Sequence, residues 1–201
     1  MNNFNPVVIP LKTNIKLKKE SNDELVDNTL YKQTTGSLRY LFNTRLYVCH
    51  NVILVNIFID ELTIYHLLRE KRILRYIIGT PDHGILMPHD QNTIREAKIY
   101  GYSYSDWMGD QDDRKSISSY LFMLGASPIS LSSNKQGIAA LSSCEIVYVA
   151  ASYGLNQTLW FEMLLEELNV SNIVKIKLLV DNQSTIDLTY RPMSHDRSKH
   201  I

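Results

Sequence analysis

The sequence has few cysteines and no excess of charge of either sign. Only two of the 201 residues are cysteines, Cys49 and Cys144. Two are too few for the disulfide framework of a small secreted domain, and they suit a reducing compartment. Lysine and arginine together number 21, as do aspartate and glutamate, so the formal net charge is zero. A free-standing nucleic-acid-binding domain usually carries a basic excess, so any contact with nucleic acid must depend on a local patch.

Long apolar runs are missing as well. Among the first 14 residues only 7–9 form an apolar run, and Pro10 ends it. A secretory signal needs a basic start and about 7–15 apolar residues. No stretch approaches the roughly 20 apolar residues of a membrane span. We therefore expect no signal peptide, no membrane span and a cytoplasmic or nuclear location. The hydrophobic content of 44% is still ordinary for a globular protein with a core.

The first 80 residues have helical spacing. It predicts helices over residues 29–41, 46–58 and 61–78, of which the third is the most clearly amphipathic. On a helical wheel its apolar residues gather on one side and its basic residues on the other: Leu67, Ile73, Leu74, Ile77 and Ile78 against Arg69, Lys71, Arg72 and Arg75. The glycine and proline in residues 79–81 predict its end.

After Pro81 the pattern changes to strands. Short apolar or aromatic runs predict strands over residues 99–104, 118–124, 129–132 and 176–180. A long helical stretch covers residues 142–168, and another helix begins at Ser184. This order predicts a mixed α/β fold, in which helices pack on a mixed sheet. We expect a helical unit over residues 1–80, a linker over 81–97 and a sheet domain over 98–201.

Several short segments then coincide in order along the chain. Residues 101–110 (GYSYSDWMGD), 112–116 (DDRKS), 127–130 (SPIS), 140–145 (ALSSCE), 179–184 (LVDNQS) and 198–201 (SKHI) resemble successive blocks of the ribonuclease H domain in the Pol polyproteins of copia-type retrotransposons. Upstream, residues 5–7 (NPV), 36–41 (GSLRYL), 71–76 (KRILRY) and 79–81 (GTP) look like the end of the reverse transcriptase of the same family. The resemblance covers nearly the whole chain. It implies a reverse transcriptase tail joined to a truncated ribonuclease H domain.

This resemblance implies a particular chemistry. Ribonuclease H hydrolyses the RNA strand of an RNA–DNA hybrid with two divalent metals, Mg²⁺ or Mn²⁺, which carboxylate oxygens hold. The family has four such acids, on the first strand, the first helix, the fourth strand and a late C-terminal segment. Glu145 and Asp181 match the second and third. Their alternative roles are structural, because Glu145 suits a helix start and Asp181 suits a helix N-cap.

The sequence departs from the family at the first acid. Tyr104 stands where the family has aspartate, and a phenol is neutral at pH 7 and supplies no charge to a metal. Asp106 points to the same strand face but lies about 6.6 Å further along, so it can substitute only if the strand slides or bulges. The fourth acid is expected beyond Ile201. With two of four carboxylates missing, we expect no efficient hybrid cleavage and no cofactor. The alternative is a weak nuclease that uses Asp106, Glu145 and Asp181 with Mg²⁺ or Mn²⁺.

A second resemblance points to a different class of protein. Arg72, Ile73, Leu74 and Arg75 match the RxLR tetrapeptide of secreted oomycete effectors, and copia-like chains can be classed with these effectors. Such a protein would be secreted, delivered into a host plant cell and bound to a host protein, where it would modulate defence or cell death. The simpler interpretation is that the arginines form the solvated face of a packed helix. A nucleic-acid contact is a further alternative.

Overall fold

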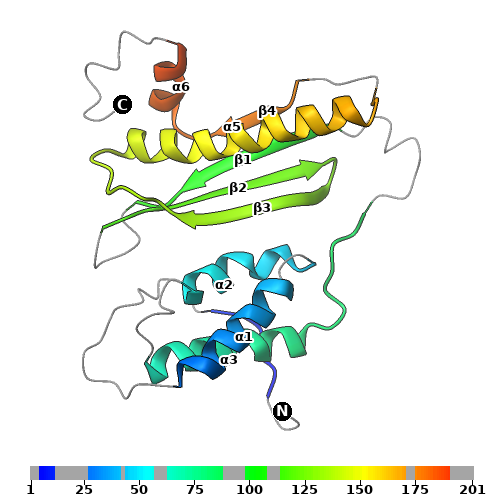
Figure 1. Ribbon diagram of the computed structural model, residues 1–201, viewed down its shortest axis with the longest axis vertical. Helices are drawn as coiled ribbons and strands as arrows, with labels where there is room; N and C mark the ends of the chain where they lie inside the picture. Colours follow the sequence, from blue (N-terminus) through cyan, green and yellow to red (C-terminus); the bar gives the residue numbers. More distant parts are fainter. Residues whose placement is uncertain are drawn as a thin grey trace. The chain divides into compact units, whose positions relative to one another are not determined.

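The computed structural model describes residues 5–11, 27–41, 44–56, 63–87, 98–107, 114–170 and 175–190. The chain divides into two compact units, Met1–Ile85 and Leu86–Ile201. The described part of the first unit contains helices without a sheet, and the second contains a mixed sheet with helices (Figure 1). The predicted mixed α/β class is therefore confirmed. No helix in the described part of the chain is long and apolar enough to cross a membrane.

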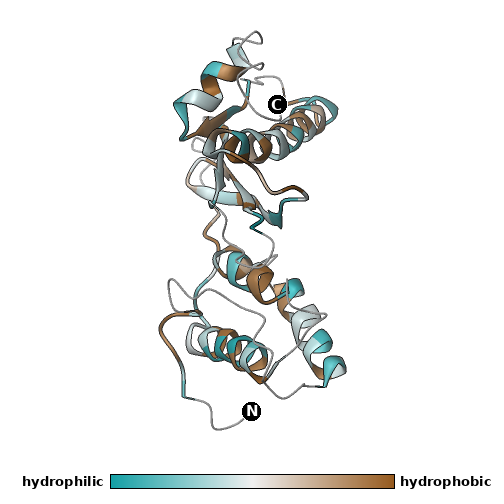
Figure 2. Ribbon diagram, turned by 90° about the vertical axis from the view of Figure 1, so that its left-hand side faces the viewer, coloured by the Kyte–Doolittle hydropathy of each residue, from teal (hydrophilic) through white to brown (hydrophobic). Residues whose placement is uncertain are grey.

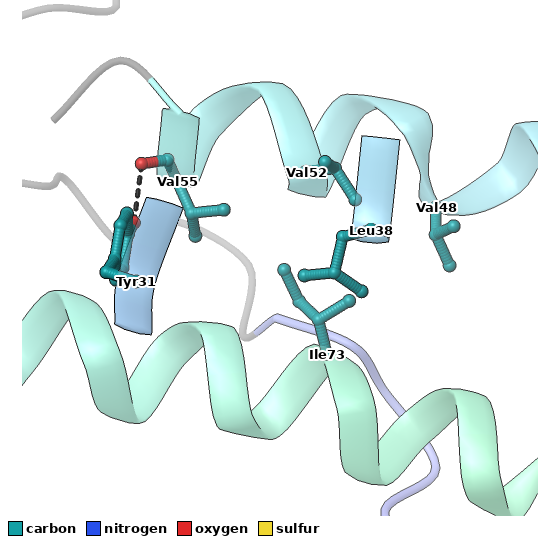
Figure 3. Close-up of a cluster of buried hydrophobic side chains, with 6 residues drawn as sticks. All are labelled: Tyr31, Leu38, Val48, Val52, Val55 and Ile73. Atoms are coloured by element: carbon teal, nitrogen blue, oxygen red, sulfur yellow. Dashed lines mark hydrogen bonds between the residues drawn. The ribbon is translucent and has the colours of Figure 1, made fainter. Parts of the chain in front are cut away.

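The described part of the first unit consists of three α-helices, a short 3₁₀ turn and irregular segments. The helices and the turn are α1 (Asn28–Leu41), η1 (Leu46–Val48), α2 (Cys49–Asn56) and α3 (Ile64–Gly79). Figure 3 shows the core between the three helices, in which six side chains are fully buried: Tyr31, Leu38, Val48, Val52, Val55 and Ile73. The Tyr31 hydroxyl donates a hydrogen bond of 2.6 Å to the Val55 carbonyl at the end of α2. This bond satisfies the phenol inside the core and links α1 to α2.

The amphipathic pattern of α3 is confirmed in part. Ile73 is fully buried, and Leu67, Leu74 and Ile77 pack against the same core. Ile78 was expected on this side but is 49% exposed, because it lies at the last turn of the helix. The segment predicted as one helix over residues 46–58 begins as the 3₁₀ turn, α2 ends at Asn56, and residues 57 and 58 lie outside the described part.

Four strands form the sheet of the second unit. They are β1 (Ile99–Ser105), β2 (Ile117–Leu124), β3 (Ser127–Lys135) and β4 (Lys177–Val180), in the order β3-β2-β1-β4. β1 and β2 pair antiparallel, as do β2 and β3, whereas β4 runs parallel to β1. The parallel pair needs a crossover connection, and it is supplied by α5 (Ser143–Glu167). α6 (Gln183–Tyr190) follows β4.

The long helix α5 packs against β1, β2 and β4. The core between α5 and the sheet includes Phe122, Phe161 and Ile176. Gly101 makes the close packing in the middle of β1 possible, because a Cβ atom there would lie 2.6 Å from the Phe122 ring. Burial alternates along β1, so that Gly101 and Ser103 are buried while Tyr102 and Tyr104 are exposed. Since strand side chains alternate between faces, the two tyrosines lie on the face opposite α5.

The second unit buries one side of α5 in the same way that the first buries one side of α3. Hydrophilic and hydrophobic residues alternate along the helices of both units (Figure 2). α3 fits the pattern of a helix that contributes one side to a core, whereas α5 also exposes large apolar side chains such as Leu159, Trp160 and Met163.

Candidate functional site

Tyr104 and Asp181 lie at the same level on neighbouring strands. The parallel pairing of β1 with β4 ends at Ser103 opposite Val180. Tyr104 follows Ser103 in β1, and Asp181 follows Val180 at the end of β4. The Tyr104 side chain is 59% exposed, and Asp181 is also exposed. The fold therefore puts the phenol of Tyr104 on the strand next to Asp181, at the position where the resemblance implies the first acid.

Glu145 lies in the first turn of α5 and is buried. Ser142 is the N-cap of this helix, and its hydroxyl accepts a hydrogen bond of 3.1 Å from the Glu145 N–H. The Glu145 carboxylate in turn accepts a hydrogen bond from the Leu141 N–H, with 2.7 Å between Oε2 and N. A helix start leaves its first N–H groups unpaired, and such exchanges between side chain and backbone satisfy them. The Glu145 carboxylate therefore stabilises the turn that leads into α5.

The start of α6 lies against the start of α5. Asn182, and not Asp181, caps α6, because its Oδ1 accepts a hydrogen bond of 3.1 Å from the Thr185 N–H. The Thr185 hydroxyl donates a hydrogen bond of 3.1 Å to the carbonyl of Cys144. This contact brings the segment that carries Asp181 to the same end of the sheet as Glu145. Asp181 is left exposed at this end and takes no part in the capping.

Asp106 follows β1 and is bound to the start of β2. Its Oδ1 accepts a hydrogen bond from the Ile117 N–H. The backbone N–H of Asp106 in turn donates a hydrogen bond of 3.2 Å to the Ile117 carbonyl. The β1–β2 ladder pairs residue for residue from Ile99 opposite Leu124 to Ser105 opposite Ser118. The slide or bulge that Asp106 would need to replace the first-strand acid is therefore not present in this ladder.

Gln136 connects three elements at this end of the sheet, and nothing in the sequence pattern singled it out. Its side chain is buried, and its Nε2 donates to the Ser118 hydroxyl at 2.8 Å and to the Ile146 carbonyl at 3.1 Å. A longer contact of 3.4 Å reaches the Ser105 hydroxyl. These bonds hold the first turn of α5 against β1 and β2. A glutamine after a strand is common on surfaces, so only the tertiary structure reveals this role.

The residues that the structure describes do not form a two-metal site. Within the described ranges, no three His, Cys, Asp or Glu side chains gather so that they could hold a metal ion. One oxygen of Glu145 accepts from Leu141, the carboxylate of Asp106 accepts from Ile117, and the first-strand position holds Tyr104. Mg²⁺ takes several hard oxygen ligands in octahedral geometry, and a phenol hydroxyl does not replace a carboxylate in that role.

The RxLR-like tetrapeptide lies inside α3. Ile73 is fully buried, and Leu74 packs against the same core. The Arg75 Nε donates a hydrogen bond of 2.8 Å to the Asn5 carbonyl in the lead-in segment. Arg72 is half-buried, and its Nε is covered without a hydrogen-bond partner. The two arginines are therefore partly packed, and are not the fully solvated face that the helical wheel suggested.

Comparison with known proteins gives the same family as the sequence blocks. The chain is 37% identical to the retrovirus-related Pol polyprotein from transposon RE1 of Arabidopsis thaliana over 98% of its length, and 33% identical to that from transposon TNT 1-94 of Nicotiana tabacum over 100% of its length. It spans only 13% and 15% of these two relatives. It is also 34% identical to the secreted RxLR effector protein 161 of Plasmopara viticola, over 66% of this chain and 92% of the effector.

These likenesses define a segment of a retrotransposon polyprotein. The chain belongs to the Pol polyproteins of copia-type retrotransposons. No family model matches it. No solved structure matches it either.

Proposed function

We propose that this chain is a degenerate ribonuclease H-like Pol fragment that does not cleave RNA–DNA hybrids efficiently. The observation that carries the proposal is the position of Tyr104, level with Asp181 on the neighbouring strand. An acid at this position would face the metals together with Asp181. The phenol removes one negative charge and one hard ligand from the site.

The remaining acids do not compensate for this loss. Two-metal hydrolysis requires ligands that clamp both the attacking and the leaving oxygen. Glu145 already stabilises the helix start through its bond to Leu141, and Asp106 is bound to β2. Of these three acids, Asp181 is the exposed one. A single carboxylate binds Mg²⁺ weakly, because the ion gives up its hydration water reluctantly.

Metal binding tests this proposal before any catalysis is measured. The full chain and its Tyr104→Asp and Tyr104→Phe variants are titrated with Mn²⁺ by calorimetry. We expect the wild type and the phenylalanine variant to need at least about ten times the Mn²⁺ concentration at which the aspartate variant is half-saturated, since roughly 1.4 kcal/mol of lost binding is a tenfold change in affinity. Wild-type binding as tight as that of the aspartate variant would contradict the proposal.

A second candidate is a secreted effector that acts inside host plant cells. The likeness to the effector from Plasmopara viticola favours it, because the match covers 92% of that protein. The folded body would then bind a host protein and modulate defence or cell death. Expression of the chain inside host leaf cells, followed by scoring of induced cell death, tests this candidate. The candidate is eliminated if cell death is the same as in a leaf that expresses an unrelated protein.

A further inference from the structure

The core of the helical unit contains a buried carboxylate that the proposed function does not use. Glu70 of α3 is 0% exposed. Its Oε1 accepts a hydrogen bond of 2.7 Å from the Thr35 hydroxyl of α1. Its Oε2 is buried and has no hydrogen-bond partner. A charged carboxylate inside a core normally needs a paired cation or several hydrogen bonds, because its loss of hydration is costly. Glu70 has one such bond.

The positive charge that acts on Glu70 is that of Lys71, which is exposed. In α1 the titratable group at this level is Tyr31, whose phenol donates to the Val55 carbonyl. In α3 one exposed cation, Lys71, follows Glu70 directly, and the buried His66 lies one turn earlier within the capping box of Thr63. The other titratable or charged groups of the packed elements are the half-buried Tyr65, Arg69, Arg72, Arg75 and Tyr76 of α3, Cys49 and His50 of α2, and the exposed Lys32, Arg39 and Tyr40 of α1.

The protonation of Glu70 follows from this environment. Burial raises the pKa of Glu70 to about 7, and this effect outweighs the Thr35 hydrogen bond and the charge of Lys71, which both lower it. Burial first, and then the charge of Glu70, raise the pKa of the Tyr31 phenol well above its ordinary value. Tyr31 therefore stays neutral near pH 7, whereas Glu70 changes its charge in this range.

We propose that Glu70 makes the helical unit a proton-dependent switch. With Glu70 protonated, α3 packs against α1 and the unit is closed. Loss of this proton puts a charge with one hydrogen bond into the core, and the contact between α1 and α3 loosens. This inference does not depend on the proposed function of the second unit.

The direction of the pH dependence is fixed by the raised pKa. The folded unit holds the proton more tightly than the unfolded chain, in which a glutamate has its ordinary pKa of 4.5. The stabilisation is complete below this value and is lost as the pH rises towards about 7. Because one proton is lost on opening, the equilibrium constant for opening rises by up to about tenfold for each pH unit in this window. The test must isolate Glu70 from the other titratable groups of the unit.

Hydrogen exchange of the full chain provides this test. Protection of the α1 and α3 amides is measured between pH 5 and 8 and corrected for the intrinsic exchange rate. In the wild type we expect protection to fall by up to about tenfold per pH unit and to level off above pH 7. Glu70→Gln keeps an acceptor for Thr35 and carries no charge, so its protection should not fall with pH. Glu166→Gln, an exposed change on α5, is the matched control and should leave the fall unchanged.

A second variant covers the case in which Glu70→Gln fails to fold. Thr35→Val removes the hydrogen bond that favours the charged carboxylate. The pH at which protection is half lost should therefore move upwards, whereas a residue with only a structural role would lower protection equally at every pH. The proposal is overturned if the wild type shows no fall, if Glu70→Gln keeps it, or if Thr35→Val leaves the midpoint in place.

Discussion

The Oε2 atom of Glu145 lies 2.7 Å from the backbone nitrogen of Leu141 and accepts its hydrogen bond. The residue that the family resemblance marks as the helix acid is therefore part of the turn that begins α5. This contact accounts for a glutamate at position 145 without any appeal to catalysis. Its structural role does not depend on a metal.

If Glu145 has this structural role, we expect substitutions of Glu145 to lower the stability of the sheet unit and to leave hybrid cleavage unchanged. Glu145→Ala should lower the free energy of unfolding of the sheet unit by about 1–2 kcal/mol, because the Leu141 N–H loses its acceptor in a partly buried position. Glu145→Gln keeps an oxygen acceptor and should cost less. Ser142→Ala removes the N-cap and should cost about 1 kcal/mol. Denaturant unfolding followed by the fluorescence of the two tryptophans of the sheet unit, Trp107 and Trp160, measures all three. Equal costs for the alanine and glutamine variants at Glu145 would argue against the bond to Leu141.

Asp106 provides a similar test on the first strand. Asp106→Ala should destabilise the sheet unit by about 1–2 kcal/mol, since the Ile117 N–H is left without its acceptor. Asp106→Asn preserves an oxygen at this position and should be close to neutral. Neither change should alter hybrid cleavage, because the β1–β2 ladder is regular and holds Asp106 away from a catalytic role. A strong loss of measured cleavage in Asp106→Ala would show that Asp106 had replaced the missing acid.

The close packing of α5 on the sheet predicts an intolerant glycine. Gly101→Ala would put a Cβ atom 2.6 Å from the Phe122 ring, and overpacking of this kind costs about 1–3 kcal/mol. Gly137→Ala is the matched control, because nothing lies within 4 Å of a Cβ atom at that position. Thermal unfolding of the two variants compares them directly. A melting temperature for Gly101→Ala equal to that of the wild type would mean that the ring moves aside at no cost.

The tetrapeptide in α3 predicts different effects for its charged and apolar members. Changing both Arg72 and Arg75 to Ala should cost roughly 1 kcal/mol, of which the hydrogen bond from Arg75 to Asn5 is the main part. Leu74→Ala should cost about 2–5 kcal/mol because it leaves a cavity. Only the arginine pair therefore separates a delivery signal from damage to the fold.

The effector candidate makes its own prediction for the arginine pair. If the tetrapeptide acts in delivery, the double variant of the secreted protein should not enter host cells, while protein expressed inside those cells should keep its effect. Uptake of a fluorescently labelled protein into host leaf cells measures entry. Unchanged entry of the double variant eliminates delivery by this tetrapeptide, and leaves any role of the folded body to the expression test.

The sequence predicted the helices and strands better than it predicted which polar residues are buried. Helical spacing located α1, α3 and α5, and short apolar or aromatic runs located all four described strands, because both signals come from residues that face a core. The same logic fails for buried polar groups. Glu70 and Gln136 are both almost fully buried, but each sits among polar neighbours in sequence. Their burial depends on Thr35 and Ser118, which are 35 and 18 residues away.

The candidate site was predictable only as far as the resemblance extends. The blocks around Tyr104, Glu145 and Asp181 marked which residues to compare. Which of them are bound to the backbone depends on tertiary contacts, such as that of Asp106 with Ile117. The capping of α6 shows the same limit, because the neighbouring Asp181 and Asn182 are equally plausible caps by residue type, and Asn182 takes the role.

The measurement that tests the central claim most directly is hybrid cleavage by the full wild-type chain. A labelled RNA–DNA hybrid is incubated with excess protein, once with Mg²⁺ and once with Mn²⁺, and the RNA products are separated by size. Because Tyr104 replaces an acid that the two metals require, we expect no RNA product above that of a protein-free control with either metal. Cleavage at a rate comparable to that of an intact ribonuclease H would contradict the account.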